Sequence, residues 1–404
     1  MPSSSHANFH DYLQWTWAAA ENPMMQLRVV FLVCLLLPMV ACKREDAGVH
    51  FFAEGQPQAL SDWHVLKVED GRLALNQGVV PYDLNTPLFS DYAHKLRTLW
   101  MPAGKPARYD AQAAFDFPVG TIISKTFYYP LPAGAKWDGK SVARTDPAQD
   151  SFRDGVLDLS KVHLVETRLL VRREVGWEAI PYVWNEAQTE ATLKRAGALV
   201  ALELVDADGN REAVDYQVPD QNQCASCHAT DNKTRALHPI GPKARHLNRD
   251  FAYAEGSENQ LAHLSRIGYL SGASDPQRAP RNANSQDMAH ATLEDRARAY
   301  LDVNCGHCHS PTGPAITSGM WLDASIIDRL KLGFCKQPVA AGKGTGNRLY
   351  DIAPGHADAS VLVFRMDSDD PSVMMPELGR SVVHREGVQL IRQWIDAQHG
   401  ACDS

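Results

Sequence analysis

Residues 224–228 read Cys-Ala-Ser-Cys-His, and residues 305–309 read Cys-Gly-His-Cys-His. Both stretches have the pattern C-x-x-C-H, which is the attachment site of a c-type haem. In that chemistry each thiol bonds to one vinyl group of the porphyrin, and the histidine that follows becomes a ligand of the iron. The sequence therefore predicts two covalently bound haem c groups. The attachment cysteines would be Cys224, Cys227, Cys305 and Cys308, and the proximal iron ligands would be His228 and His309.

A pair of C-x-x-C motifs is also typical of structural zinc sites, and that interpretation is the main alternative. Two observations favour haem over zinc. Both copies carry a histidine directly after the second cysteine. In addition, the export signal described next removes the usual cytosolic setting of such a zinc site.

An export signal is expected near the N-terminus. Residues 28–41 read RVVFLVCLLLPMVA, one positive charge followed by an apolar run. The run has the length of the apolar part of a signal peptide and is too short for a membrane-spanning helix. It ends at Ala41 and Cys42, which together are similar to a bacterial lipoprotein box, so Cys42 is the expected lipidation site. The alternative is an ordinary secretory signal cleaved after Ala41, which Met39 fits less well.

Residues 1–41 are thus expected to comprise an upstream extension and the signal peptide. Two tryptophans and two acidic residues before the apolar run do not suit a signal peptide, so we expect translation to start at Met24 or Met25. Lipid attachment would anchor the mature protein to a membrane. The expected location is the periplasm or cell envelope of a Gram-negative bacterium. Lys43 directly follows the lipidation site, and this favours the outer membrane over the inner membrane.

The cysteine count leaves one pair over. The chain has eight cysteines. Cys34 would leave with the signal peptide, Cys42 would carry lipid, and four would hold haem. The remaining two, Cys335 and Cys402, are expected to form a disulfide because the compartment is oxidising. The alternative is that both are free thiols.

The formal net charge of −8 is mildly acidic. Such a surface argues against nucleic acid as a partner and permits electrostatic steering of a basic redox partner protein. The sequence contains no recognisable Ser-His-Asp set, phosphate-binding loop or dinucleotide-binding fingerprint.

Residues 42–56 are predicted to be a tether, and residues 57–220 a β-rich, sandwich-like domain. β-Branched and aromatic residues are frequent in the second range, and turn residues separate the runs. Hairpins are expected over 64–76 and 199–218, and one helix is expected over 186–195.

After residue 220 the pattern changes to helix and loop. Residues 221–286 contain the first motif and end in a stretch rich in Ser, Pro, Asn and Arg. Residues 287–404 are predicted to form a mainly α-helical, cytochrome c-like domain that holds the second haem. Its expected helices span 292–301, 359–366 and 385–398, where apolar residues recur with helical spacing. The predicted fold class is therefore a multidomain α+β protein.

Met375 is the expected sixth ligand of the second haem, because it lies between the last two predicted helices, as in small cytochromes c. A thioether opposite a histidine raises the reduction potential and suits electron transfer. Met374 and Met320 are alternative ligands, and simple core packing of Met375 is another interpretation.

The sixth ligand of the first haem has several candidates. His238 is the leading one, followed by His246 and Met288. An open iron position is the remaining alternative, and it would allow chemistry at the iron.

Beyond the two motifs, the chain resembles a family of uncharacterised bacterial dihaem c-type cytochromes. The resemblance spans most of the mature chain and implies a haem protein of the periplasm or cell surface, with no substrate. The stretches that carry it are PYDLNTPLFSDYA at 81–93, ETRLLV at 166–171, YVWNE at 182–186, NQCASCH at 222–228, LNRD at 247–250 and YLDVNCGHCH at 300–309.

Three functions are consistent with these features. The first is a dihaem c-type cytochrome that transfers electrons in the cell envelope. The second is a dihaem enzyme similar to a peroxidase, with the first haem as an open catalytic site. The third is a β domain that binds a ligand and is coupled to a haem relay. An electron carrier is favoured over a catalyst, and no catalytic side chain is assigned.

Overall fold

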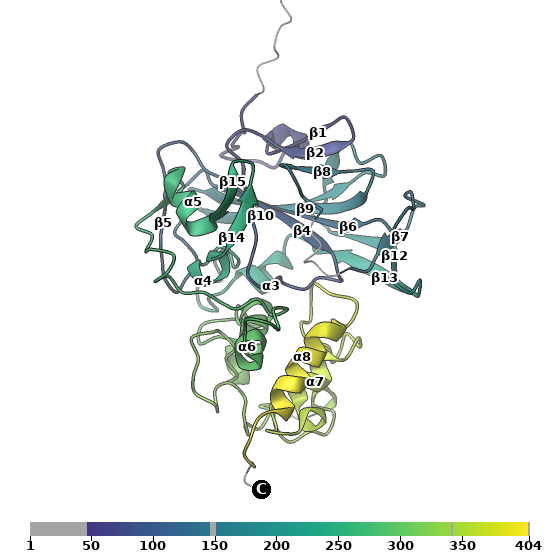
Figure 1. Cartoon of the computed structure of the whole chain (residues 1–404), viewed down its shortest axis with the longest axis vertical. Helices are drawn as coiled ribbons and strands as arrows, with labels where there is room; N and C mark the ends of the chain where they lie inside the picture. The colour runs from purple at the N-terminus through teal and green to yellow at the C-terminus, as the bar shows by residue number, and fades with distance from the viewer. Residues whose placement is uncertain (1–46, 146–150, 341, 403–404) are drawn as a thin grey trace, which may run out of the picture. The chain divides into compact units, whose positions relative to one another are not determined.

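The computed structural model describes residues 47–145, 151–340 and 342–402 (Figure 1). The predicted signal peptide, with Cys34 and the expected lipidation site Cys42, lies outside these residues. The chain from Gly48 onward forms one compact unit. None of the helices in the described part of the chain combines the length and hydropathy that a membrane crossing requires.

A six-stranded antiparallel sheet is the centre of the β-rich region, with the strand order β11-β10-β9-β6-β4-β3. The longest pairings join β6, β9 and β10, whose β-branched and aromatic residues fit a buried pleated surface. The strands are β3 (Val80–Tyr82), β4 (His94–Trp100), β6 (Ile122–Pro130), β9 (Val162–Arg173), β10 (Gly176–Trp184) and β11 (Ala191–Leu193).

One face of this sheet packs against a three-stranded sheet of order β1-β2-β8. Its strands are β1 (Leu66–Glu69), β2 (Arg72–Leu75) and β8 (Val156–Asp158). Leu73 and Leu157 are fully buried in the shared core. Trp63, at the end of the 3-10 helix η1 (Leu60–Trp63), donates a hydrogen bond to the hydroxyl of Tyr182 at 2.7 Å, so buried polar atoms there are paired. Phe52 packs on the same core, so the predicted tether contributes to this region.

The opposite face packs, over part of its area, against the sheet of order β13-β12-β7. Its strands are β7 (Ser141–Ala143), β12 (Ala198–Val205) and β13 (Arg211–Val218). Phe127 and Tyr129 of the central sheet contact Leu202, Val214 and Tyr216 in one apolar cluster. The prediction of a β-rich region is confirmed, and both predicted hairpins are present as β1-β2 and β12-β13.

The helix predicted over 186–195 is wrong. The chain turns after β10, and Ala191–Leu193 pairs with β10 as the edge strand β11. Gln188 has a φ angle of 56°, a left-handed conformation that interrupts any helix. Ala191 and Leu193 are buried and the residue between them is less so. This period of two buries both side chains against the sheet, which outweighs local helix propensity.

The segment that carries the first motif folds against the central sheet. Leu247, Leu261 and Leu264 share one apolar cluster with Leu99 and Ile123 of the sheet. A parallel pairing of β16 with β5 adds a main-chain link. The elements are β5 (Ala107–Arg108), α3 (Cys224–His228), α4 (Ala244–Leu247), β14 (Asp250–Tyr253), β15 (Gly256–Asn259), α5 (Gln260–Arg266) and β16 (Leu270–Ser271).

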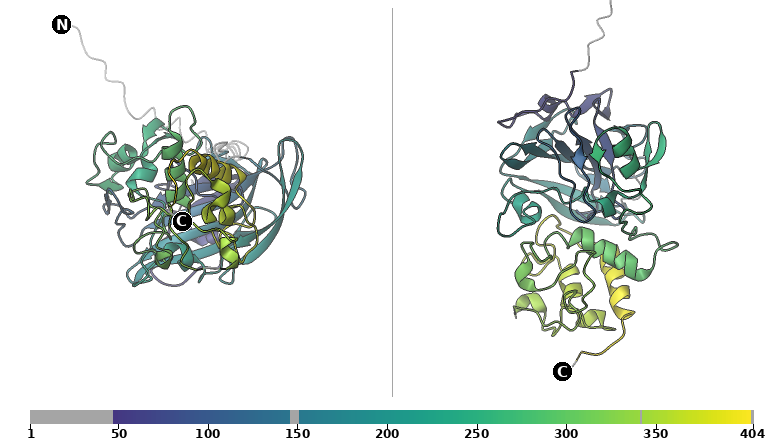
Figure 2. Two further views of the ribbon diagram at one scale, coloured as in Figure 1. Left: turned by 90° about the horizontal axis from the view of Figure 1, so that it is seen from below. Right: turned by 90° about the vertical axis from the view of Figure 1, so that its left-hand side faces the viewer.

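Every named element between residue 287 and residue 402 is helical, and each α-helix lies within three residues of its predicted bounds. Thr292 caps α6, because its hydroxyl oxygen accepts a hydrogen bond from the main-chain N–H of Asp295. Helices α6 and α8 lie side by side (Figures 1 and 2) and bury Leu301, Ile391 and Trp394 in one core. The elements are α6 (Leu293–Asn304), η2 (Ile316–Ser318), η3 (Lys343–Thr345), η4 (Ala357–Ala359), α7 (Val361–Met366) and α8 (Arg385–Asp396).

The predicted disulfide between Cys335 and Cys402 is confirmed, with Cα atoms 5.2 Å apart. It ties the end of the described chain to a loop that precedes α7 and closes a span of 67 residues.

A buried carboxylate joins the helical region to the segment of the first motif. Asp302, in the last turn of α6, receives two hydrogen bonds from Arg245 at 2.8 and 2.9 Å. Asn282 donates to it at 2.6 Å, the main-chain N–H of Ala324 donates at 3.1 Å, and Nε2 of His246 lies 2.9 Å away. Burial alone would raise the pKa of Asp302, but the hydrogen bonds from Arg245 and His246 hold it well below its ordinary value.

Replacing Asp302 with Asn should lower the free energy of unfolding by about 3 kcal/mol near neutral pH, because the buried Arg245 then keeps only Asp323, at 2.6 Å, as a counter-charge. A carboxyl whose pKa is lowered by folding adds stability above the unfolded pKa of about 3.9. That contribution is lost as the pH falls from there toward the folded pKa, so the variant and the wild type should converge in acid. Urea titrations at about pH 7 and about pH 3 measure this, with the exposed Asp208→Asn as control. An equal difference at both pH values would contradict the assignment.

Candidate functional site

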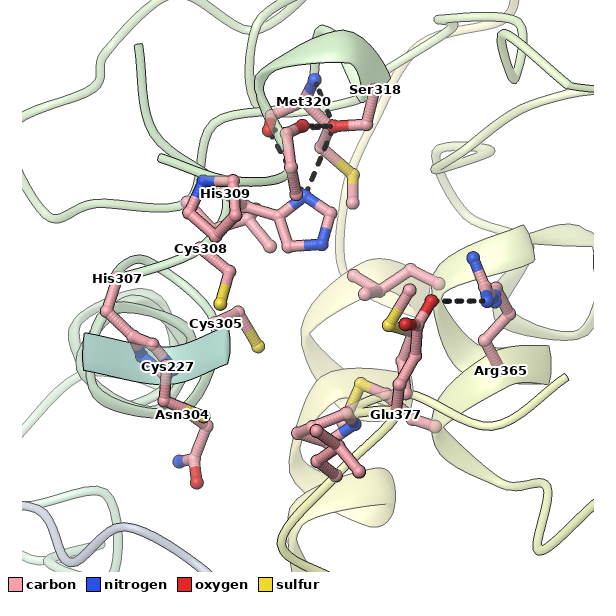
Figure 3. Close-up of a pocket in the computed structure, with 18 of the residues that line it drawn as sticks. Cys227, Asn304, Cys305, His307, Cys308, His309, Ser318, Met320, Arg365 and Glu377 are labelled. Atoms are coloured by element: carbon pink, nitrogen blue, oxygen red, sulfur yellow. Dashed lines mark hydrogen bonds and ion pairs between the residues drawn. The ribbon is translucent and has the colours of Figure 1, made fainter. Parts of the chain in front are cut away.

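A cavity of about 770 Å³ lies where the two C-x-x-C-H motifs and the loop after α7 meet. Its lining includes Cys227 of the first motif and Cys305, Cys308 and His309 of the second, together with Met375. Figure 3 shows the sulfur atoms of Cys305 and Cys308 turned toward the open centre of this cavity. The volume is in the range of cofactor-binding sites.

Helix α6 delivers the second motif to the cavity wall. A Cβ atom added to Gly306 would lie 2.8 Å from the carbonyl oxygen of Asp302, so glycine lets the motif fold tightly against the helix end. All four motif cysteines are free thiols. Burial raises the pKa of both Cys305 and Cys308 to about 12, so these thiols are protonated at neutral pH.

The ring of His309 is oriented through its Nδ1 atom. Nδ1 lies 3.2 Å from the hydroxyl oxygen of Ser318 and 3.3 Å from the carbonyl oxygen of Met320 (Figure 3). An Nδ1–H that donates to this carbonyl leaves the Nε2 lone pair for a metal. Burial lowers the pKa of His309, which keeps the imidazole in the neutral form that binds metals.

Methionines contribute to the same cavity. Met375, the predicted sixth ligand of the second haem, lines it, and so does the alternative candidate Met320. The carbonyl group of Met320 holds Nδ1 of His309, which places Met320 on the histidine side. Met374, the other alternative, is buried and is not part of the lining.

Arg380 fixes the loop that carries Met375, a role that sequence reasoning missed. Its buried guanidinium donates hydrogen bonds to the carbonyl oxygens of Met375 at 2.9 Å and Ser368 at 2.8 Å. Weaker bonds reach the carbonyl oxygens of Arg365, Met366 and Val382. One cation thereby satisfies several main-chain acceptors in a loop without regular structure.

The first motif is held in the same way as the second. It forms α3. Nδ1 of His228, at the end of this helix, lies 2.8 Å from the carbonyl oxygen of His238 in the loop that follows. Burial lowers the pKa of His228 to about 3, so this imidazole is neutral as well. Cys224 is buried in the apolar cluster beneath the central sheet, whereas Cys227 lines the cavity. Both motif histidines thus keep Nε2 as the metal-binding nitrogen.

The structure shows the surroundings of the three residues predicted as sixth ligands of the first haem. His238 is exposed, and it holds His228 through its carbonyl oxygen on the Nδ1 side of the ring. Both ring nitrogens of His246 have partners, a main-chain carbonyl oxygen and the carboxylate of Asp302. Met288 is 79% exposed. The identity of this ligand therefore stays a prediction.

The two motifs touch each other, which sequence reasoning missed. The Sγ atom of Cys308 lies 3.5 Å from the carbonyl oxygen of Ser226, in the middle of the first motif. The flanking loops are joined by Thr312, which donates to the carbonyl oxygen of Thr230 at 3.3 Å and accepts from the main-chain N–H of Asn232 at 2.8 Å. Sequence spacing carries no signal for this contact, because the intervening residues form their own helices and hairpin.

The sheet face near the first motif carries positive charge. Lys125 of β6 lies between Arg97 of β4 and Arg168 of β9 in the register of the sheet. Burial, followed by the neighbouring Arg168 and Arg97, lowers the pKa of Lys125 to about 7. Sequence reasoning missed these residues because single basic residues in a strand usually face solvent.

Within residues 47–145, 151–340 and 342–402, no three His, Cys, Asp or Glu side chains are grouped to hold a metal ion. The zinc site considered from the sequence is thus not assembled there. A haem iron takes at most two axial side chains from the protein, so its ligands would not form such a group.

No protein family, curated protein or solved structure matches the chain. The resemblance to bacterial dihaem cytochromes therefore stays a prediction.

Replacing Arg380 with Met should lower the free energy of unfolding by about 3–4 kcal/mol, because several buried carbonyl groups lose a charged donor. Urea denaturation followed by tryptophan fluorescence measures the change. The control is Arg385→Met, which removes an exposed arginine whose ion pair with Glu212 spans 3.2 Å and should cost less than about 1 kcal/mol. Equal losses in the two variants would show that Arg380 does not fix the loop.

Proposed function

We propose that this protein is an exported dihaem c-type cytochrome that transfers electrons in the cell envelope. One haem would be bound covalently by Cys224 and Cys227, and the other by Cys305 and Cys308. The observation that carries the proposal is the contact between the motifs, where Cys308 lies against Ser226. Two adjoining attachment sites bring two redox groups within reach of each other, as an electron relay requires.

The residues of both motifs fit a c-type haem. Each motif has two free thiols and a histidine whose Nδ1 is bound to a main-chain carbonyl group, which leaves Nε2 for iron. A bound haem supplies one-electron chemistry through its iron. The protein would hold each of the two imidazoles in a fixed orientation and surround the cofactor with apolar side chains. Leu322, Leu362 and Val388 do the latter in the large cavity.

His309 and Met375 are the proposed axial ligands of the second haem. They line one cavity from different segments of the chain, and each is held by main-chain hydrogen bonds. A methionine opposite a histidine raises the reduction potential, which suits a carrier. Arg380 acts here as a positioning residue for Met375.

The helical region supports a cytochrome c-like arrangement around the second haem. Helix α6 leads directly into the second motif, α8 packs beside α6, and Met375 lies between α7 and α8 in the chain. We therefore propose that residues 287–404 form the cytochrome c-like domain predicted from the sequence.

The proposed location is the periplasm, with a lipid anchor on Cys42. The disulfide between Cys335 and Cys402 supports export, because such bonds persist in oxidising compartments. The net charge of −8 favours a redox partner protein with a basic surface.

Haem content tests the proposal directly. The full chain, produced in a bacterium that matures c-type cytochromes, should carry two haems, measured by intact mass and by haem absorbance. Cys224→Ala with Cys227→Ala should leave one haem, and so should Cys305→Ala with Cys308→Ala. The control, Cys335→Ala with Cys402→Ala, should keep two. A chain that carries no covalent haem under these conditions would refute the proposal.

Met375→Ala should remove the weak sulfur-to-iron absorption band of the oxidised protein and lower the reduction potential of one haem, because the thioether ligand is lost. Met374→Ala is the matched control, since the side chain of Met374 is next in sequence but does not line the cavity. If the band survives in Met375→Ala, another residue is the ligand.

The spin state of the ferric haems and the turnover of peroxide by the haem-loaded protein distinguish an electron carrier from an enzyme. Two low-spin haems without peroxide turnover support electron transfer. High-spin ferric iron together with rapid peroxide turnover would instead indicate catalysis at the first haem.

A further inference from the structure

Three basic residues lie side by side across the central sheet, near the first motif. Arg97 on β4 is opposite Lys125 on β6, and Lys125 is opposite Arg168 on β9. We call these three residues the cationic row. Directly opposed like charges in neighbouring strands are destabilising unless other groups compensate them. The row therefore points to nearby anions.

The protein compensates two members of the row with carboxylates. Arg97 pairs with Asp83 at 2.7 Å, and Arg168 donates to Glu166 at 2.8 Å. Asp83 is itself shared with a further arginine. Within the described residues no carboxylate forms an ion pair with Lys125, whose amine has only the ring of Phe127 as a close partner, at 5.7 Å.

A second amine lies on the same face of the sheet, two residues before Arg97 on β4. Lys95 is opposite Phe127 and donates to the carbonyl oxygen of its near neighbour Ala93 at 2.7 Å. Its amine lies 5.5 Å from the centre of the Phe127 ring, over which the guanidinium of Arg168 also lies, at 4.3 Å. Asp91, the other nearby carboxylate, accepts hydrogen bonds from two main-chain N–H groups of the segment before α8. Lys95 and Lys125 are thus two buried amines that form no ion pair with a carboxylate among the described residues.

The same sheet face is apolar on the other side of the row. Leu99, Ile123 and Leu170 occupy the adjacent positions and share an apolar cluster with Cys224. Cys227 and His228 follow Cys224 in the same short helix α3, so they lie close to this part of the sheet. The first motif is therefore placed over a surface that changes from apolar to cationic. A haem has the matching character, an apolar ring with two carboxylates at one edge.

We propose that the cationic row and Lys95 bind the two propionate carboxylates of the haem attached to Cys224 and Cys227, with Lys125 as the main contact. This inference rests on the proposed function. Two propionates would supply the counter-charges that the two lysines lack, and so would favour the charged form of both amines. Charge-assisted hydrogen bonds of this kind are strong in a buried setting.

The test uses the full-length protein with both haems attached. Lys125→Met removes a positive charge beside the propionates. Loss of that charge favours the ferric state, so the reduction potential of the first haem should fall while that of the second haem stays unchanged. Lys125→Arg keeps the charge and should restore the wild-type potential. Lys105→Met, at an exposed lysine of the same region, is the control and should leave both potentials unchanged. The double variant Lys95→Met with Lys125→Met should shift the potential further than either single variant.

Spectroelectrochemical titration measures the potentials, and the ferric spectrum is recorded for each variant. Unchanged potentials in Lys125→Met and in the double variant would overturn the inference. A changed ferric spectrum in both Lys125→Met and Lys125→Arg would also overturn it, because Lys125 would then be an iron ligand. Failure of the proposed function is distinguishable, since the wild-type chain would then carry no covalent haem.

Discussion

The buried carboxylate of Asp302 is the interaction on which the candidate site depends. It lies one turn before Cys305, and it receives Arg245 and Asn282 from the segment that follows the first motif. A buried charge is tolerated only when its hydrogen-bonding capacity is filled, so this carboxylate admits few alternative arrangements. The end of α6 is thereby fixed against the first-motif segment, and the contact of Cys308 with Ser226 follows from that placement.

Local patterns made much of the fold predictable. The hairpins and the three α-helices of the last region are predictable from period-two and helical spacing, and the disulfide from counting cysteines. The edge strand Ala191–Leu193 was not predicted, because burial against β10 decides between helix and strand there, and local sequence does not show that burial. The contacts of Asp302 and Arg380 were not predictable either, since their partners are distant or are main-chain carbonyl groups.

His238 and Met320 illustrate a specific limit of reading ligands from sequence. Both were candidates because their side chains can bind iron, and both lie beside a motif histidine. In each case the carbonyl oxygen rather than the side chain makes the contact, by holding Nδ1 of the imidazole. Any residue type could supply that carbonyl group, so no sequence signature exists for it.

The disulfide at the end of the chain has a consequence for maturation. In the proposed export, Cys402 would enter the oxidising compartment after the other cysteines of the sequence. Cys335 would then wait for its partner, while Cys305 and Cys308 lie closer to it in sequence. Haem attachment needs those two thiols reduced, whereas closure of the disulfide needs oxidant in the same place. Early capture of Cys305 and Cys308 by the proposed haem would remove the competing thiols, so the order of the two covalent events would decide how much of the chain matures correctly.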